Sequence, residues 1–530
     1  MTNNRIGIIG SGATATYTLM NLLKSKQPLD ITIFESSAEV GKGMPYRSDM
    51  NAEYMLCNAF SREIPVLTRS LIDWLEDLPK RELGEWELSS HDLSARAFYP
   101  RLLIGEFLAS EFQSLCERAH SAGHDVKVKS LESVEDIISS ANGLVVLKTS
   151  KKDKPYEFDH VIIATGHSWH SSPKLKDADL VSPWPYTNIV SLSPGNIGIL
   201  GSSLSAIDIV VALGNAHGKF MEQSDTVLWK PNDAAAELKV TMISKEGIMP
   251  EGDFYYPFPY QPLQVFSAEA VDAEVEKGRD GLLQRLFDLL CAELDLSDPG
   301  YLIILGQQSR SLEGFFEAYF KRRKILGGLV AVKLDFAKSR KSLREKETIA
   351  YRYVLLRAHE NFDRALRHLD EDDYALFTQT LLPIFADSYA AVPHLSLARI
   401  IAMFDANVLE LKSSGEDADF RNSNGGGVLV ETDEEVLSFD VLIDARGQAP
   451  APLEHLPFPS LAKTLSAGRQ HVEAPFKLEL DASKSPSVYC LALPQLLQRY
   501  PFSQGLANSA ENGKLVAAEI LNSLDHRSVN

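Results

Sequence analysis

The feature that most constrains the fold of this chain is a segment that occurs twice. RIGIIGSGATA at residues 5–15 aligns without a gap with NIGILGSSLSA at residues 196–206. Each copy has a short apolar run, a turn of small residues and a helical pattern of apolar positions. A strand, a tight turn and a helix in this order form part of a βαβ unit, which builds parallel sheets. The sequence therefore predicts two α/β units.

A second repeated segment closes each unit. FDHVIIATG at residues 158–166 aligns with FDVLIDARG at residues 439–447, and each is preceded by a hairpin pattern with a polar turn. Opening and closing segments alternate along the chain, so two copies in tandem fit their order. The C-terminal helical stretch NSAENGKLVAAEILNSL must also be placed, and a discontinuous first domain would accommodate it.

The first turn fits the dinucleotide-binding pattern G-x-G-x-x-G/A. Its residues are Gly10, Ser11, Gly12, Ala13, Thr14 and Ala15. The first glycine permits the tight turn, the second lets the backbone approach a pyrophosphate, and the small final residue lets helix and strand pack closely. The helix N-terminus offers free N–H groups to the phosphates. Glu35 ends the next strand, DITIFE, at the distance expected for binding ribose hydroxyls.

A glycine loop follows, EVGKGMPYRS at residues 39–48. Gly41 and Gly43 would allow this loop to run close to a long cofactor. The alternatives are an ordinary glycine loop here and a first turn that binds no ligand.

The second turn keeps its first glycine, Gly201, followed by Ser202, but has Ser203 in place of the middle glycine. A serine keeps the backbone farther from a phosphate, although its hydroxyl can donate a hydrogen bond. The following strand, KVTMIS, ends at Ser244 and is followed by Lys245, which together would accept a 2′-phosphate where an acid would repel it. These residues predict NADPH rather than NADH, and a degenerate structural duplicate is the alternative.

A mostly helical segment separates the second turn from its closing strand. Residues 266–380 have helical spacing and little strand character. Within it, residues 321–346 are rich in Lys and Arg. We expect a solvated helical face there, and a surface for an anionic ligand is the alternative.

Composition limits the possible functions. A chain of 530 residues with a formal net charge of −19 predicts two or three domains and argues against nucleic-acid binding. The four cysteines are far apart and form no C-x-x-C motif, so we expect reduced, mostly buried thiols and no metal site. No apolar run is long enough to span a bilayer, and the N-terminus lacks a signal-peptide pattern. We therefore expect a cytoplasmic protein with no membrane partner.

Several stretches together resemble bacterial flavoproteins with paired FAD- and NAD(P)-binding domains. This family is related in layout to N-hydroxylating and Baeyer–Villiger-type flavin monooxygenases. The stretches are IGIIGSGATA, the FE–x–GKGMPY loop, EYMLCNAF, FYPRLLIGEFL, VIIATGH, IGILGSSLSAID, ISKEGIMP and DARGQAP. The resemblance spans residues 5 to about 450 and is weakest in the helical middle. It implies FAD in the first domain and NAD(P)H in the second.

The resemblance also implies positions for further FAD contacts. Gly43, Tyr46 and Asn58 would lie towards the flavin, and Arg101 would contact an FAD phosphate or an acidic substrate.

Val134 lies where backbone groups often bind the adenine, while Thr165 and Gly166 would border FAD near the exit from its domain. Two departures from the family pattern are Ser203 and Arg446. The arginine is either a ligand for an anion or a member of a surface ion pair.

The expected fold class is α/β, with two Rossmann-like dinucleotide-binding domains and a helical insertion. In flavoproteins with two dinucleotides the chain begins the flavin domain, leaves it to build the nicotinamide domain, and returns. On this plan residues 1–190 and 436–530 form the FAD domain, residues 191–265 and 381–435 the NAD(P)H domain, and residues 266–380 the insertion.

The predicted function is that of an FAD-dependent oxidoreductase. The preferred hypothesis is an NADPH-dependent monooxygenase that oxidises a small polar molecule with molecular oxygen through a flavin C4a-hydroperoxide. The alternatives are an NAD(P)H-dependent flavin reductase or dehydrogenase, and a flavin-binding redox sensor. No catalytic base is assigned. His167, Trp169 and His170 follow the ATG turn, where we expect them to pack in the loop, and the alternative is that they face the domain cleft.

Overall fold

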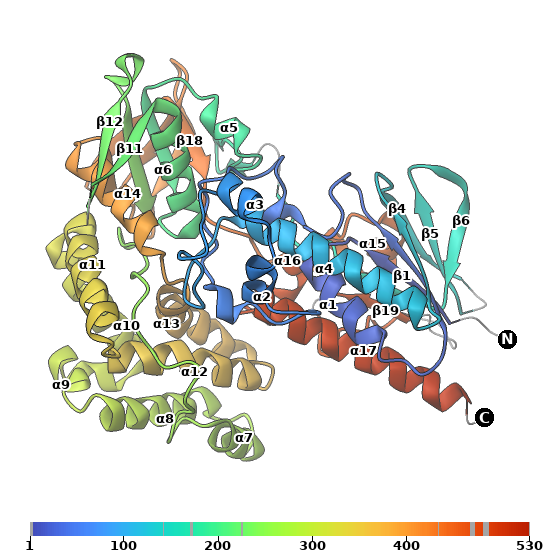
Figure 1. Cartoon of the computed structure of the whole chain (residues 1–530). Helices are drawn as coiled ribbons and strands as arrows, with labels where there is room; N and C mark the ends of the chain where they lie inside the picture. Colours follow the sequence, from blue (N-terminus) through green and yellow to red (C-terminus); the bar gives the residue numbers. More distant parts are fainter. Residues whose placement is uncertain are drawn as a thin grey trace. The chain divides into compact units, whose positions relative to one another are not determined.

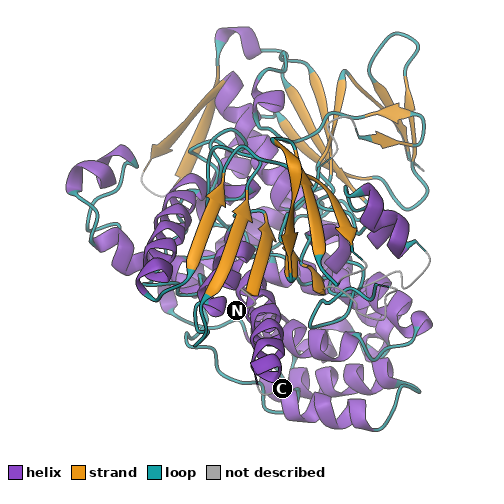
Figure 2. Cartoon of the chain, turned by 90° about the vertical axis from the view of Figure 1, so that its right-hand side faces the viewer, coloured by secondary structure: helices purple, strands orange, loops and turns teal. Residues whose placement is uncertain are grey.

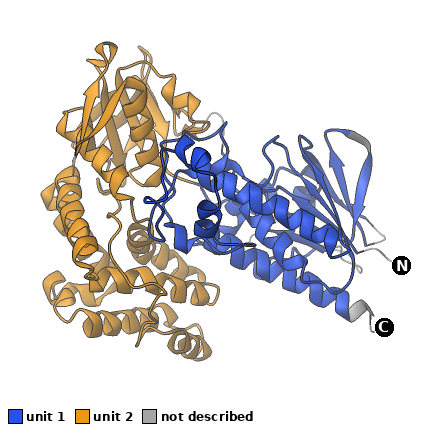
Figure 3. Ribbon diagram, in the orientation of Figure 1, with its two compact units in different colours: residues 1–169, 448–530 blue, residues 170–447 orange. Residues whose placement is uncertain are grey.

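The computed structural model shows two compact units, each an α/β assembly (Figure 3). The first unit consists of residues 1–169 and 448–530, and the second of residues 170–447. The structure describes residues 4–140, 143–169, 173–223, 226–432, 434–466, 472–480 and 487–528.

The first unit is built on a five-stranded parallel sheet whose strand order is β19-β7-β1-β2-β3. Its strands are β1 (Asn4–Ile9), β2 (Leu29–Phe34), β3 (Asp125–Lys129), β7 (His160–Ile163) and β19 (Ser487–Cys490). Strands β4 (Val134–Ser139), β5 (Val145–Thr149) and β6 (Lys152–Phe158) form a separate antiparallel sheet. Because the main strands are parallel, the loops after them emerge at one edge of the sheet.

The first unit also contains α-helices, several of which cover this sheet and bury its apolar side chains (Figures 1 and 2). The helices are α1 (Ala13–Leu22), α2 (Leu71–Glu76), α3 (Lys80–Glu85), α4 (Arg101–Ser121), α15 (Pro459–Leu465), α16 (Leu493–Leu496) and α17 (Leu506–Ser528). Ile6, Ile8 and Ile31 of the central strands are fully buried, as expected for a parallel sheet covered by helices. Helix α17 lies along α1, where Gly513 allows close approach to the backbone of Thr18.

The second unit has a four-stranded parallel sheet whose order is β14-β13-β10-β18. Its strands are β10 (Asn196–Leu200), β13 (Lys239–Ser244), β14 (Leu409–Ser413) and β18 (Val441–Asp444). Smaller sheets contain β8 (Lys174–Leu175), β9 (Ala178–Asp179), β11 (Gly218–Gln223), β12 (Thr226–Pro231), β15 (Asp419–Asn422), β16 (Val428–Glu431) and β17 (Val436–Phe439). Helices α5 (Thr187–Val190), α6 (Leu204–His217) and α14 (His394–Asp405) accompany the strands.

The two units repeat one topology. Strand β1 lies between β2 and β7, and β10 lies between β13 and β18. Each closing strand follows a three-stranded antiparallel sheet, β4-β5-β6 in one unit and β15-β16-β17 in the other. The predicted α/β class with two Rossmann-like units is therefore confirmed.

A block of helices interrupts the second unit between β13 and α14. It consists of α7 (Ala268–Glu276), α8 (Leu282–Ser297), α9 (Tyr301–Leu305), α10 (Leu312–Leu326), α11 (Gly328–Glu345), α12 (Ala350–Leu366) and α13 (Glu371–Tyr389). Buried Phe287, Phe315, Phe362 and Phe385 pack inside it. The predicted helical insertion is thus present (Figure 1).

The compact units differ from the proposed domain boundaries in two respects. Residues 170–190 were expected in the FAD domain but belong to the second unit. The segment after residue 436 was expected in the FAD domain, but β18 pairs with β10 in the second sheet. The chain returns to the first unit at Gln448. Because FDVLIDARG is the counterpart of FDHVIIATG, its strand β18 pairs with β10 as β7 pairs with β1.

None of the described helices combines the length and the apolar character needed to cross a bilayer.

Candidate functional site

The first candidate site lies at the carboxyl edge of the five-stranded sheet. Gly10 follows β1, and its N–H donates to the carbonyl of Phe34 at 2.8 Å. Gly10 has a φ of +99°, and a Cβ there would lie 2.4 Å from the carbonyl oxygen of Ala164. Glycine is therefore required at this turn. Gly12 then caps α1 without a side-chain capping bond, an arrangement that suits the predicted contact with a pyrophosphate.

Glu35 follows β2 at the same edge and is buried. Its Oε2 accepts hydrogen bonds from the backbone N–H and the hydroxyl of Ser11, at 3.1 and 2.7 Å. Its Oε1 accepts the N–H of Ser37 at 2.8 Å and, more weakly, the hydroxyl of Ser36 at 3.3 Å. A ribose hydroxyl could replace the weak Ser36 contact, so the carboxylate suits the predicted role.

The other residues of the first turn position the helix. The Ser11 hydroxyl is buried, and it accepts the N–H of Gly41 at 3.0 Å. Thr14 donates to the hydroxyl of Ser509 in α17 at 3.1 Å. Ala13 opens α1, and Ala15 is fully buried against the core. Ser11, Thr14 and Ala15 thus direct their side chains to the protein, leaving backbone groups to face a ligand.

The glycine loop lies beside the turn, although its two glycines have different roles. A Cβ on Gly12 would lie 3.1 Å from the Cα of Gly43, so the loop passes directly over the start of α1. A Cβ on Gly41 would instead meet Ala109 of α4 at 2.9 Å. The expectation that Gly41 makes room for a ligand is not met, because helix α4 occupies that side.

Tyr46 of this loop lies near Arg101, whose charge acts on its phenol. Tyr46 ends the short 3₁₀ helix η1 (Met44–Tyr46), and its carbonyl approaches α4 where Gly105 has no side chain. Arg101 begins α4, and its Nε donates to the carbonyl of Leu56 at 3.2 Å. Burial raises the pKa of Tyr46 well above its usual value, so its phenol stays neutral.

The remaining predicted FAD residues lie on three further segments. Asn58 is half-buried in the loop that precedes the short 3₁₀ helix η2 (Ser61–Glu63). Val134 begins β4, where a bulge separates it from Asp136. Thr165 is exposed just after β7, and Gly166 follows with a φ of +66°. Strand order places these last two next to the first turn, because β7 and β1 are neighbours.

Sequence reasoning gave too little weight to His167 and Trp169. Among the described residues, His167 Nδ1 and Trp169 Nε1 are buried without a hydrogen-bond partner. Burial, with a smaller effect of Arg101, lowers the pKa of His167 to about 4. Buried polar atoms without partners mark places where a ligand can supply them. With the glycine turn and Glu35, they fit a site for FAD. His170 lies outside the described residues.

Asn51 is another residue that the sequence did not single out. Its side chain is buried and donates to the carbonyl of Met44 at 3.2 Å, which fixes the start of η1. Among the described residues its Oδ1 has no partner. The signal in the sequence was weak, because one asparagine in a loop is common.

The second turn reproduces the backbone contacts of the first. The N–H of Gly201 donates to the carbonyl of Ile243 at 2.7 Å. Gly201 has a φ of +126°, and a Cβ there would lie 2.5 Å from the carbonyl oxygen of Ala445. Gly198 packs on the Phe439 ring as Gly7 packs on that of Phe158. The duplication read from the sequence is therefore present in the structure.

The two turns differ in the residue that follows the second strand. By register Ser244 takes the place of Glu35. Among the described residues its Oγ is buried and has no hydrogen-bond partner. Lys245 is exposed, with Glu416 at 3.8 Å. An unpaired hydroxyl beside an exposed lysine fits a ribose phosphate better than a free ribose hydroxyl.

Ser202 and Ser203 have separate surroundings in the second turn. Ser202 is buried, and its hydroxyl donates to the carbonyl of Ile248. Ser203 is exposed at the N-cap of α6 and makes no side-chain capping bond. Its position at the helix N-terminus suits the predicted contact with a phosphate.

The structure shows the partners of Arg446 and of two residues in the basic stretch 321–346. Arg446 forms a bidentate ion pair with Asp444 at 2.7 and 2.8 Å, which is the surface-pair alternative. The basic stretch is only partly a solvated face. Arg323 is buried against Asp387, and Lys324 pairs with Glu246. The sequence could not indicate these partners, which lie far away along the chain.

The four cysteines are free, and three of them are buried. Burial raises the pKa of Cys490 to about 12 and that of Cys116 to about 11. Neither thiol is a thiolate near neutral pH, which makes both poor nucleophiles.

Comparison with known proteins identifies the relatives of the chain. Residues 7–168 match a family model described as FAD-NAD(P)-binding, and residues 267–389 match one described as the YdhS-like middle domain. The chain is 34% identical over 522 residues to the YdhS protein of Escherichia coli K12, covering 98% of this chain and 97% of that protein.

Solved structures of flavin enzymes are similar at low identity. The ornithine N-hydroxylase of Kutzneria sp. 744 is 14% identical, with 99% of this chain and 100% of that chain covered and a TM-score of 0.49. The L-lysine 6-monooxygenase of Pseudomonas syringae is 12% identical, with 98% and 99% covered and a TM-score of 0.46.

The family model, which covers residues 7–168, confirms the expected cofactors as FAD and NAD(P). The model for the middle domain covers almost all of the helical insertion, which the relative from Escherichia coli therefore shares. The chain belongs to the YdhS family of FAD/NAD(P)-binding proteins.

Proposed function

We propose that this protein is an NADPH-dependent flavin monooxygenase that oxidises a small polar molecule. The observation that carries the proposal is the pair of matching nucleotide turns with different residues beyond the second strand. Glu35 in the first unit suits the ribose of FAD. Ser244 and Lys245 in the second unit suit the 2′-phosphate of NADPH.

The first unit would hold FAD through its backbone and a few side chains. The N–H groups at the start of α1 would bind the pyrophosphate, and Glu35 would accept a ribose hydroxyl. His167 Nδ1 and Trp169 Nε1 would gain a partner. Bound FAD supplies the redox chemistry, since it accepts hydride from a reduced nicotinamide and passes electrons to oxygen or another acceptor.

The cysteines favour a small-molecule acceptor over a protein disulfide. All four are free, and burial raises the pKa of Cys57, Cys116, Cys291 and Cys490. A dithiol that relays electrons needs two adjacent cysteines, one of them with a lowered pKa. Oxygen or a small molecule that reaches the flavin directly is therefore the better candidate.

Anaerobic mixing with NADPH tests the proposal first. The flavin absorbance of the purified protein should bleach under argon, in the presence of small amines, amino acids or heterocycles as trial substrates. Failure of NADPH to reduce the flavin with any of them would contradict the proposal.

Labelled oxygen then distinguishes oxygenation from simple oxidase activity. A monooxygenase places one atom of ¹⁸O₂ in the product, whereas a reductase releases the consumed NADPH equivalents as hydrogen peroxide. Gly12→Glu should lose the yellow colour, because Gly12 lies against the loop at Gly43. Gly84→Glu, at a glycine with no atom near its Cβ position, is the matched control and should keep it.

A further inference from the structure

The helical insertion reaches the residues that follow β13. Lys324 of α10 forms an ion pair with Glu246, which comes directly after Ser244 and Lys245. The Lys324 side chain is 45% exposed and that of Glu246 is 25% exposed. The pair therefore lies where a solvent-borne nucleotide could meet it.

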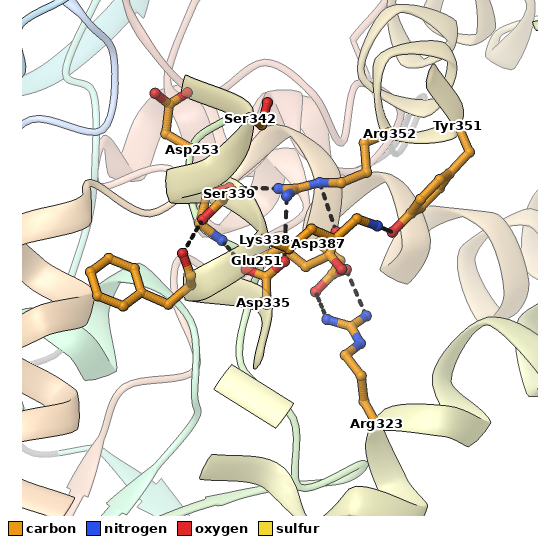
Figure 4. Close-up of polar contacts among 12 residues, drawn as sticks. Glu251, Asp253, Arg323, Asp335, Lys338, Ser339, Ser342, Tyr351, Arg352 and Asp387 are labelled. Carbon is orange, nitrogen blue, oxygen red and sulfur yellow. Dashed lines mark hydrogen bonds and ion pairs between the residues drawn. The ribbon is translucent and has the colours of Figure 1, made fainter. Parts of the chain in front are cut away.

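Helix α10 holds Lys324 in place through its neighbour Arg323. The Arg323 side chain is only 12% exposed, and its two terminal nitrogens bind the Asp387 carboxylate at 3.0 and 2.7 Å (Figure 4). The same side chain donates to the carbonyl of Met249 at 3.3 Å. A buried bidentate pair fixes the rotation of the helix, so the residue after it has a fixed direction.

The segment after Glu246 is held from the same helical block. Arg352 is almost fully buried and binds Glu251 at 2.8 Å and the carbonyl of Gly252 at 2.6 Å (Figure 4). Asp335 accepts the N–H of Gly252 at 2.7 Å.

The nucleotide turn is tied to the same segment. The hydroxyl of Ser202 donates to the carbonyl of Ile248. The turn, the segment from Ser244 to Gly252 and the helical insertion thus form one connected structure within the second unit.

We propose that Lys324 is a specificity residue for the 2′-phosphate of NADPH. A free carboxylate at Glu246 would repel a phosphate and would accept a hydrogen bond from the 2′-hydroxyl of NADH. Lys324 neutralises that carboxylate. It also provides a second cation, besides Lys245, near the end of β13. This assignment rests on the proposed function, because it assumes that the second turn binds a nicotinamide nucleotide.

Equilibrium binding tests the assignment without turnover. NADPH, NADH and 2′,5′-ADP are titrated into the full-length protein by calorimetry. Lys324→Ala should weaken NADPH and 2′,5′-ADP about tenfold, the effect of removing one charge partner, and leave NADH unchanged or tighter. Lys321→Ala, an exposed lysine of the same helix, is the matched control and should change each affinity by less than about twofold.

Substitution of Glu246 provides a second test, in which the affinity for NADPH is expected to rise. Glu246→Gln removes the repulsion, so the double variant Lys324→Ala with Glu246→Gln should recover most of the NADPH affinity. The NADPH-to-NADH ratio of dissociation constants is the readout, and a thermal melt checks that each variant is folded.

The outcomes separate this assignment from the proposed function. Wild-type protein that binds neither nucleotide, or prefers NADH, overturns the proposed NADPH site itself. Wild-type protein that prefers NADPH, with a ratio unchanged by Lys324→Ala or unrecovered by Glu246→Gln, overturns only the role of Lys324.

Discussion

At the scale of single residues, glycines decide where the backbone can turn. Gly10 and Gly201 both have a positive φ, and at both the space for a Cβ is filled by a carbonyl oxygen. The opposing residue is Ala164 in one unit and Ala445 in the other. The geometry of each turn therefore depends on the closing strand of its own unit.

Replacing these glycines should destabilise one unit at a time. Gly10→Ala or Gly201→Ala forces a strained backbone and displaces a carbonyl, for a loss of about 2 kcal/mol or more. Urea denaturation should show the loss for each variant. Gly84→Ala is the opposite control, since an open helical glycine gains roughly 0.5–1 kcal/mol on becoming alanine. Unchanged stability of the first two variants would contradict the geometry described.

The buried imidazole of His167 should make the first unit sensitive to acid. Its folded pKa of about 4 lies below the ordinary value of 6.5, so the unfolded chain binds a proton more readily. Stability from this residue is complete above pH 6.5 and falls as the pH drops towards 4, by up to about 3 kcal/mol. Thermal melts from pH 7.5 to 4.5 should therefore be less pH-dependent for His167→Asn. An equally steep fall in this variant would contradict the prediction.

At the scale of elements, buried charges join the helical insertion to the segment that follows β13 in the same unit. Arg352 of α12 and Asp335 of α11 both bind the segment around Gly252, and Arg323 of α10 binds Asp387 of α13. Burial raises the pKa of Asp335 to about 6, although the guanidinium of Arg352 opposes this. Paired buried charges of this kind define a unique arrangement, but each depends on its partner.

Removal of one cation should show this dependence. Arg352→Met leaves Glu251 and Asp335 buried without their counter-charge, which costs about 3–5 kcal/mol. Arg344→Met, whose side chain is 70% exposed, should change stability by no more than about 0.5 kcal/mol. Chemical denaturation measures both. Equal losses of unfolding free energy in the two variants would mean that the buried arginine does not stabilise the fold through its ion pairs.

Local patterns predicted the elements well, whereas distant partners could not be predicted. The run KVTMIS was expected as a strand and is β13 from Lys239 to Ser244. Turn chemistry located both nucleotide turns, since it depends on adjacent residues. The pairs Arg323–Asp387 and Lys324–Glu246 join residues far apart in sequence, and no periodicity marks such contacts. The sequence analysis placed strand β18 in the first domain, because it followed the layout of related flavoproteins. The repeat of FDHVIIATG as FDVLIDARG would have placed it in the second.

At the scale of the whole molecule, one unit is continuous in sequence and the other is not. Residues 170–447 form the second unit alone, whereas the first unit needs residues from both ends of the chain. Strand β19 pairs with β7, and helix α17 packs on α1. The C-terminal residues therefore complete the first unit.

Dissection of the chain should reflect this difference. A fragment of residues 170–447 should be folded and bind NADPH with the affinity of the full chain. Truncation after residue 447 should leave the first unit without β19 and α17 and abolish FAD binding. Circular dichroism and flavin absorbance provide the readouts. An aggregated fragment, or a truncated protein that remains yellow, would contradict the division described.

The pairing of β19 with β7 also sets the order in which the protein can mature on a ribosome. At ordinary translation rates, roughly 20–60 s separate the synthesis of residues 1–169 from that of strand β19. During this interval the middle unit can fold, while β7 presents an edge without its partner. The first unit therefore stays incomplete until the last strand emerges, and nascent chains stalled after residue 447 should be colourless.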